Sequence, residues 1–145
     1  MDNNGKVLFI SINDGSDTRI RKELKTLTRQ GDVIFVGALK DNDISLNKVA
    51  GVNYNFIKGN TSNVSSYFKL FFLVLKLRFR FFRKIRSVHV INETCLISCY
   101  LAIIGLPIIL DIFDSIFLKR LQFLKDSFIE KLIHSIPKNI LVTDD

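Results

Sequence analysis

The sequence has no tryptophan, and it contains only two cysteines, two prolines and two histidines in 145 residues. Thirteen phenylalanines and three tyrosines supply all the aromatic rings. That balance suits a hydrophobic core and membrane contact better than a platform that stacks sugars or bases. An apolar fraction of 48% excludes a disordered chain. The length allows one domain with a proper core, so we expect a single domain over residues 1–145.

The two cysteines, Cys95 and Cys99, lie four residues apart in a stretch of helix length. Without further Cys or His nearby they are poor zinc ligands, and helical geometry does not favour a disulfide between them. We expect two buried thiols, as in a reducing cytosol. The opening MDNNGK has no apolar core. No secretory signal is predicted, and the expected location is cytoplasmic.

Acidic residues are missing from segment 67–86, which holds seven basic residues, although the whole chain carries a net charge of only +7. The remainder of the chain is therefore neutral. A neutral body with one basic patch favours contact with an anionic surface at one place. It disfavours nucleic acid as a partner, because nucleic-acid-binding proteins usually spread charge over the docking face.

Segment 67–86 is predicted to form a helix that lies on a membrane surface. At about 100° per residue, its Phe and Leu side chains occupy a broad face and its basic side chains a narrow one. It should not span the membrane, because charges interrupt the run of about 20 apolar residues that a span needs. The alternative is a crossover helix whose Phe face packs on a sheet. The basic residues assigned to membrane contact are Lys69, Lys76, Arg78, Arg80, Arg83 and Lys84.

Apolar runs of two lengths alternate along the chain. Six short runs rich in β-branched residues are predicted strands: 6–12, 32–37, 52–57, 88–91, 107–110 and 139–143. Helices are predicted at 18–30, at 67–86, between the fourth and fifth strands, and at 116–136, where Asp126 and Ser127 divide the last one. Strict alternation with short links predicts a doubly wound α/β fold with a mostly parallel sheet of about six strands.

Polar residues that follow these strands are the predicted ligand-binding residues, because ligands bind beyond the carboxyl ends of parallel strands. Three loops supply them: Asn13, Asp14 and Gly15; Asn92 and Glu93; and Asp111, Phe113 and Asp114. The acidic residues suit either a general base or an ordinary helix cap or Asx-turn. No catalytic base is singled out, and no metal is predicted.

Neither histidine is predicted to belong to this group. His89 lies within an apolar strand pattern, which favours a strand-face or core position, and His134 lies on the last helix, away from this edge. The first loop has a single glycine, whereas the dinucleotide-binding pattern needs three and the P-loop needs Gly-Lys-Ser/Thr. No cofactor is predicted.

Several of these segments resemble one known family. KVLFISINDGSDTRIRKELKTLTRQGDVIFVG is similar to the first βαβ unit of the family 4 retaining glycosyltransferases, which carries an Asp-x-Arg-x-x-Lys-Glu pattern. SVHVINE followed by GLPIILDIFDSI resembles that family's later pair of strands, and KLIHSIPKNILVTDD resembles the helix and strand that come next. The residues that match the first pattern are Asp17, Arg19, Lys22 and Glu23.

The resemblance implies the amino-terminal, acceptor-side, Rossmann-like half of a GT-B enzyme of bacterial surface-polysaccharide synthesis, retaining and without an obligatory metal. In that family a carboxy-terminal domain holds the nucleotide sugar, and residues 1–145 correspond to the first domain only. We therefore expect a chain that is inactive alone. Its expected partners are a donor-domain chain and either an anionic membrane surface or a lipid-linked acceptor, with the chain peripheral on the inner face of the plasma membrane.

A non-catalytic flavodoxin-like signalling module is the alternative from another class. A receiver domain of this type needs an acidic pair after its first strand, an Asp after the third and a Lys after the fifth. The chain has Asn13-Asp14 at the first place but Lys58-Gly59 at the second and Asp111 at the third. The receiver pattern therefore fails at two of its three positions.

Overall fold

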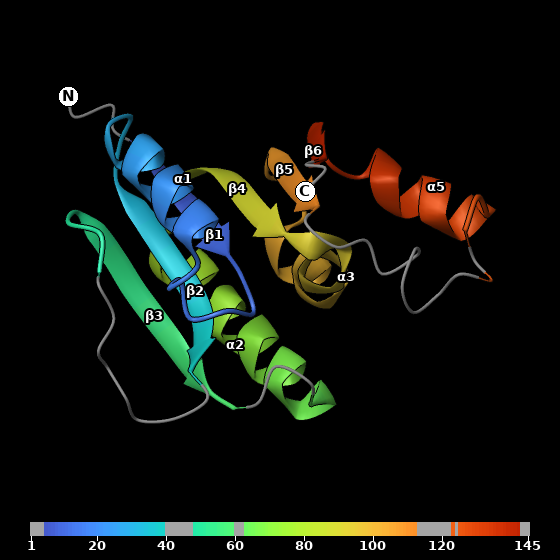
Figure 1. The fold of residues 1–145 in the computed structure, drawn as a ribbon, viewed down its shortest axis with the longest axis horizontal. Coiled ribbons are helices and arrows are strands. Elements are labelled where there is room, and N and C mark those ends of the chain that lie inside the picture. Colours follow the sequence, from blue (N-terminus) through green and yellow to red (C-terminus); the bar gives the residue numbers. More distant parts are fainter. Residues whose placement is uncertain (1–4, 40–47, 60–62, 113–122, 124, 143–145) are drawn as a thin grey trace.

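The computed structural model describes residues 5–39, 48–59, 63–112, 123 and 125–142 (Figure 1). Strands and helices alternate along these residues, as the sequence predicts, except that no described helix lies between β2 and β3. The elements are β1 (Lys6–Ile10), α1 (Thr18–Thr28), β2 (Val33–Leu39), β3 (Val52–Lys58), α2 (Val64–Arg80), β4 (Ile85–Ile91), α3 (Asn92–Ile103), β5 (Ile108–Ile112), α5 (Phe128–Ser135) and β6 (Asn139–Val142).

The six strands form one sheet in the order β3-β2-β1-β4-β5-β6, and each neighbouring pair is parallel. The order in which strands are added to the sheet reverses at β1. Strands β2 and β3 lie on one side of β1, and β4, β5 and β6 lie on the other. This is the topological switch point of a doubly wound sheet, beside which ligands bind in open α/β folds. The predicted α/β class, the parallel sheet and the six strands are confirmed.

Helices cover both faces of this sheet, with α1 on one face and α2 and α3 on the other (Figure 1). Alternate side chains of a strand point to opposite faces, so β1 contributes to both cores. Leu8 and Ile10 pack under α2 and α3, whereas Phe9 packs with Phe35 under α1. All four side chains are fully buried.

Helix α1 begins where a capping side chain satisfies its free amide groups. The Asp17 carboxylate accepts hydrogen bonds from the amides of Arg19 and Ile20, at 2.8 Å and 3.3 Å. Ile20 and Leu24, one helical turn apart, are both fully buried against the sheet. Capping and burial together fix the position of α1 over the first strands.

Helix α2 is shorter at its end than predicted. It stops at Arg80, and the chain turns through residues 81–84, where Arg83 has a φ of 66°. Strand β4 begins at Ile85, three residues earlier than expected, because the buried Ile85 pairs with Lys6 of β1. Arg83 and Lys84 therefore lie in a turn and not on the helix.

Helix α5 begins directly after Ser127, and the Ser127 side chain accepts a hydrogen bond from the Glu130 amide at 3.3 Å. The predicted start of a helix after Asp126 and Ser127 is therefore confirmed. The first part of the predicted helix 116–136 lies largely outside the described residues, so that part stays a prediction.

Cys95 and Cys99 are free, buried thiols on α3, as predicted. Burial raises the pKa of Cys95 to about 12 and also raises the pKa of Cys99. Since the thiolate is the reactive form, both should react with iodoacetamide more than about tenfold more slowly in the folded chain than in urea. Mass spectrometry of timed samples at pH 8 measures this, and equal labelling rates in buffer and in urea would contradict it.

Candidate functional site

The candidate site lies at the sheet edge where the parallel strands end, and the first loop is its best-exposed part. Asn13 is exposed there, while its amide donates to Ser11 Oγ at 3.1 Å. Asp14 accepts a hydrogen bond from the Ser16 amide at 2.9 Å, which is an Asx-turn. Gly15 has a φ of +84°, and a Cβ there would lie 3.1 Å from the Phe35 ring. The loop therefore needs glycine at this position to lie close against β2.

Asn92 and Glu93 follow β4 with no loop between, because they are the first residues of α3. Asn92 has a φ of 66°, which turns the chain sharply from strand to helix. Glu93 is fully buried, and its Oε1 lies 3.3 Å from Nε2 of His134. The prediction that His134 lies away from this edge is wrong. Ile133 and Ile136 pack α5 against the core beneath α2 and α3, and this packing brings His134 to Glu93.

Asp111 was expected in a loop beyond the fifth strand, but β5 continues to Ile112 and Asp111 lies inside it. It pairs with Ile91 of β4 and Leu141 of β6, and it is 1% exposed. Phe113 and Asp114 lie outside the described residues, so their place beside Gly15 stays a prediction.

Asp111 belongs to a group of four charged or polar side chains that we call the charged cluster. Arg19 and Glu23 come from α1, His89 from β4 and Asp111 from β5. Arg19 Nη2 donates to Asp111 Oδ1 at 2.8 Å, and Arg19 Nε lies 3.4 Å from Glu23 Oε1. His89 Nε2 lies 3.5 Å from Glu23 Oε2 and 4.0 Å from Asp111 Oδ2. Side chains from three elements that are far apart in sequence thus meet at one point beneath α1.

Strand and helix periodicity account for this convergence. His89 and Ile91 share one face of β4, and Asp111 is the register partner of Ile91. That face lies under α1, where Arg19 and Glu23 are one turn apart. The sequence predicts a strand-face or core position for His89, without a contact to Glu23. Two sequence signals are consistent with this contact: the two-residue alternation of β4, and the four-residue spacing of Arg19 and Glu23 on α1.

Burial sets the protonation of the charged cluster. It raises the pKa of Glu23 to about 8, the Asp111 carboxyl adds to the rise, and Arg19 opposes it. Burial lowers the pKa of His89, although Asp111 acts in the other direction. Burial therefore favours the neutral forms of both Glu23 and His89.

Helix α2 carries a second feature, a stripe of phenylalanines that faces solvent. Leu70, Val74 and Leu77 form the buried face of this helix. On the opposite side Phe68 and Phe72 are more than 60% exposed. The alternative in which the Phe face packs on the sheet is therefore wrong for these rings. The exposed rings of α2 and the turn after it, which we call the Phe stripe, are Phe68, Phe72, Phe79 and Phe82.

Basic side chains lie beside the Phe stripe. Arg78 and Arg83 both lie over the Phe82 ring, about 6 Å from its centroid. Arg80 lies 5.3 Å from the centroid of Phe81, and Lys69 Nζ donates to the Lys58 carbonyl at 3.3 Å. Except for the half-buried Arg78, the six basic residues predicted for membrane contact are exposed.

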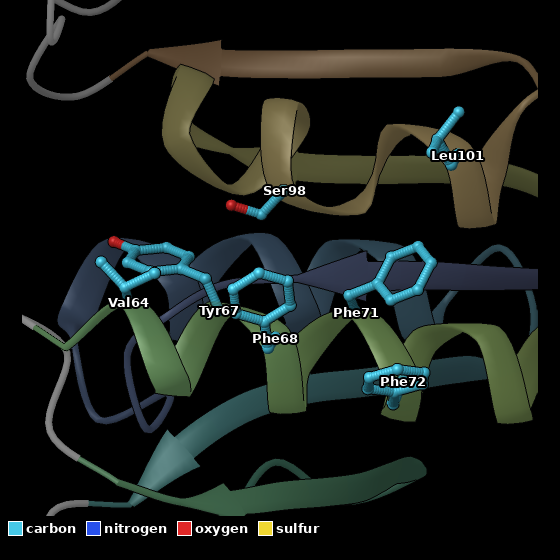
Figure 2. Close-up of a pocket in the computed structure, with 7 residues that line it drawn as sticks. All are labelled: Val64, Tyr67, Phe68, Phe71, Phe72, Ser98 and Leu101. Carbon is cyan, nitrogen blue, oxygen red and sulfur yellow. The ribbon is translucent and has the colours of Figure 1, made fainter.

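Next to the Phe stripe, a groove of about 390 Å³ runs between α2 and α3. Figure 2 shows Phe71 of α2 directed toward α3 and Ser98 of α3 directed toward α2. Apolar side chains make up most of the wall. The lining residues are Val64, Tyr67, Phe68, Phe71, Phe72, Ser98 and Leu101.

No family model matches the chain, and no curated protein matches it significantly. Among the described helices, none is both long enough and apolar enough to cross a membrane. The assignment of a function therefore depends on the fold, the charged cluster and the surface of α2.

Proposed function

We propose that residues 1–145 form the acceptor-binding half of a family 4 type retaining glycosyltransferase that acts in bacterial cell-surface polysaccharide synthesis. The observation that carries the proposal is the hydrogen-bonded ion pair between Arg19 and Asp111. These residues are 92 positions apart in sequence, and each lies in a segment that resembles that family. Two weak sequence patterns thus meet in one structural contact, which supports treating them as parts of a single motif.

Three of the four residues that match the first pattern make defined contacts in the structure. Asp17 caps α1, and Arg19 and Glu23 connect α1 to β4 and β5. These contacts hold the first loop beside the switch point between β1 and β4. A rigid edge of this kind suits the holding of an acceptor hydroxyl in a fixed direction.

In this proposal the acceptor lies at the edge formed by Asn13, Asp14 and the start of α3. The nucleotide sugar is the donor substrate and is held by a donor domain that closes over this edge. Transfer requires that donor and acceptor be held together, so neither half is sufficient. The resemblance implies that transfer retains the configuration of the sugar and needs no metal.

The surface of α2 supports a membrane-bound acceptor. Exposed Phe rings with basic side chains beside them are the composition of a helix that lies in the headgroup region. We propose that the Phe stripe and its basic neighbours hold the chain on the inner face of the plasma membrane, where a lipid-linked acceptor diffuses in the same plane.

Residues 1–145 alone should transfer no sugar. The purified chain is incubated with a panel of nucleotide sugars and lipid-linked acceptors, and products are separated by chromatography and identified by mass spectrometry. A complete two-domain glycosyltransferase run in parallel with its own substrates verifies the assay. Turnover by residues 1–145 without an added domain would overturn the proposal.

A further inference from the structure

Three buried polar atoms of the charged cluster have no hydrogen-bond partner among the described residues. They are Oε2 of Glu23 and both ring nitrogens of His89. His89 is only 6% exposed, and its Nε2 points to the space between the two carboxyl groups. A buried imidazole with neither nitrogen satisfied is uncommon in folded proteins, and it calls for a partner other than the described residues.

The geometry of these atoms fits a single metal ion. Glu23, His89 and Asp111 each offer one ligand atom, and these atoms all lie within 4.8 Å of one another. Bonds from Zn²⁺ to nitrogen or carboxylate oxygen are about 2.0–2.2 Å, so two ligands of one ion lie at most about 4.4 Å apart. The 3.5 Å and 4.0 Å separations from His89 Nε2 already fall in this range.

Arg19 leaves the inward-facing oxygens available. It contacts Oδ1 of Asp111 and Oε1 of Glu23, whereas Oδ2 and Oε2 face His89. Ionised Glu23 and Asp111 would supply two negative charges to a divalent ion, with the Arg19 guanidinium beside them. A neutral imidazole and two carboxylates are ligands that suit Zn²⁺, whereas Mg²⁺ and Ca²⁺ prefer oxygen alone.

We propose that Glu23, His89 and Asp111 bind a divalent first-row transition ion, with Zn²⁺ as the preferred ion. The ion joins α1 to β4 and β5 and so fixes the first loop at the switch point. Glu23 and Arg19 keep 21% and 27% of their side chains exposed, which leaves a route for the ion from solvent. The role is structural, so it is independent of the proposed sugar transfer.

The test uses residues 1–145 treated with EDTA and then titrated with ZnCl₂ by calorimetry. One ion is expected per chain, and the unfolding temperature should rise by about 5–10 °C at about 100 times Kd. Co²⁺ as a second probe should give visible absorption without thiolate charge-transfer bands, because Cys95 and Cys99 are not ligands. No shift in unfolding temperature, or thiolate bands with Co²⁺, would overturn the proposal.

Variants separate this site from others on the chain. Glu23→Gln keeps the size of the side chain and should weaken Zn²⁺ binding at least about tenfold, as should His89→Gln. His134→Gln, which alters the other histidine and its contact with Glu93, is the matched control and should bind as the wild type does. If His89→Gln does not fold, Glu23→Gln decides. Wild-type affinity in Glu23→Gln, or loss of binding in His134→Gln, contradicts the assignment.

Discussion

The chain should lose its binding to anionic vesicles when four basic residues, at the end of α2 and in the turn that follows it, are replaced together by Gln. Each basic side chain near an anionic leaflet contributes about 1 kcal/mol, so the partition coefficient should fall by roughly 10²–10³-fold. The remaining attraction comes from the Phe stripe and should be insensitive to lipid charge. The four residues are Arg78, Arg80, Arg83 and Lys84.

The arrangement of α2 explains why the effect should be large. Its buried face already covers the sheet through Leu70, Val74 and Leu77, and the exposed rings lie outside the hydrophobic core. Phe79 is 72% exposed and Phe82 is 59% exposed, at the basic end of the helix. Apolar and basic side chains can therefore engage headgroups together without any rearrangement of the core.

Vesicle co-sedimentation measures this, with phosphatidylserine-containing and phosphatidylcholine-only vesicles at two salt concentrations. Binding of the wild type should require anionic lipid and should weaken with salt. The matched control removes four exposed positive charges elsewhere and should bind almost as the wild type does. Equal partitioning of the α2 variant and the wild type would rule out the electrostatic contact. The control substitutions are to Gln at Lys22, Lys25, Arg29 and Lys48.

Loss of the Arg19 side chain should destabilise the fold more than loss of any exposed ion pair. Asp111 is 1% exposed, and Arg19→Gln leaves its carboxylate buried without the guanidinium. Breaking a buried pair by removing one partner costs about 3–5 kcal/mol, and the partial exposure of Arg19 favours the lower end. Urea unfolding in EDTA measures the loss without any contribution from bound metal.

The exposed pair between Lys6 and Asp32 is the matched control for this measurement. Its atoms are closer, at 2.6 Å, but the Asp32 side chain is 62% exposed. Asp32→Asn should therefore cost less than about 1 kcal/mol. Similar losses in the free energy of unfolding for Arg19→Gln and Asp32→Asn would show that the Arg19 pair does not anchor α1. The contact between Arg19 and Asp111 would then no longer support treating their two segments as one motif.

Much of the fold was predictable because the central strands β1, β2 and β4 are largely buried. Continuous apolar runs such as 7–10 and 33–36 are typical of parallel strands with helices on both faces. Asp17 and Ser127 cap α1 and α5, and both helices begin where ordinary capping chemistry allows. Strand and helix positions were predictable where they depend on residues close together in the sequence.

The site was harder to predict because its contacts join distant segments. Nothing local indicates that Asp111 continues a strand, since its place depends on pairing with both β4 and β6. The meeting of His89 with Glu23 depends on how α1 crosses the sheet, and the contact of His134 with Glu93 depends on how α5 packs. Helix periodicity alone likewise predicts that α2 extends past Arg80, because periodicity carries no information about the pairing of Ile85 with β1.

The proposal that this chain binds the acceptor, while another domain binds the donor, is best tested by measuring the binding of residues 1–145 to both substrate classes. Residues 1–145 are titrated with vesicles that carry polyprenyl-pyrophosphate-linked sugars, with matched vesicles that lack them, and with nucleotide sugars in calorimetry. We expect tighter binding to the acceptor vesicles, loss of that increment in Asn13→Ala, and very weak binding of every nucleotide sugar. Tight binding of a nucleotide sugar, with no preference for acceptor vesicles, would contradict the assignment of this chain as the acceptor half.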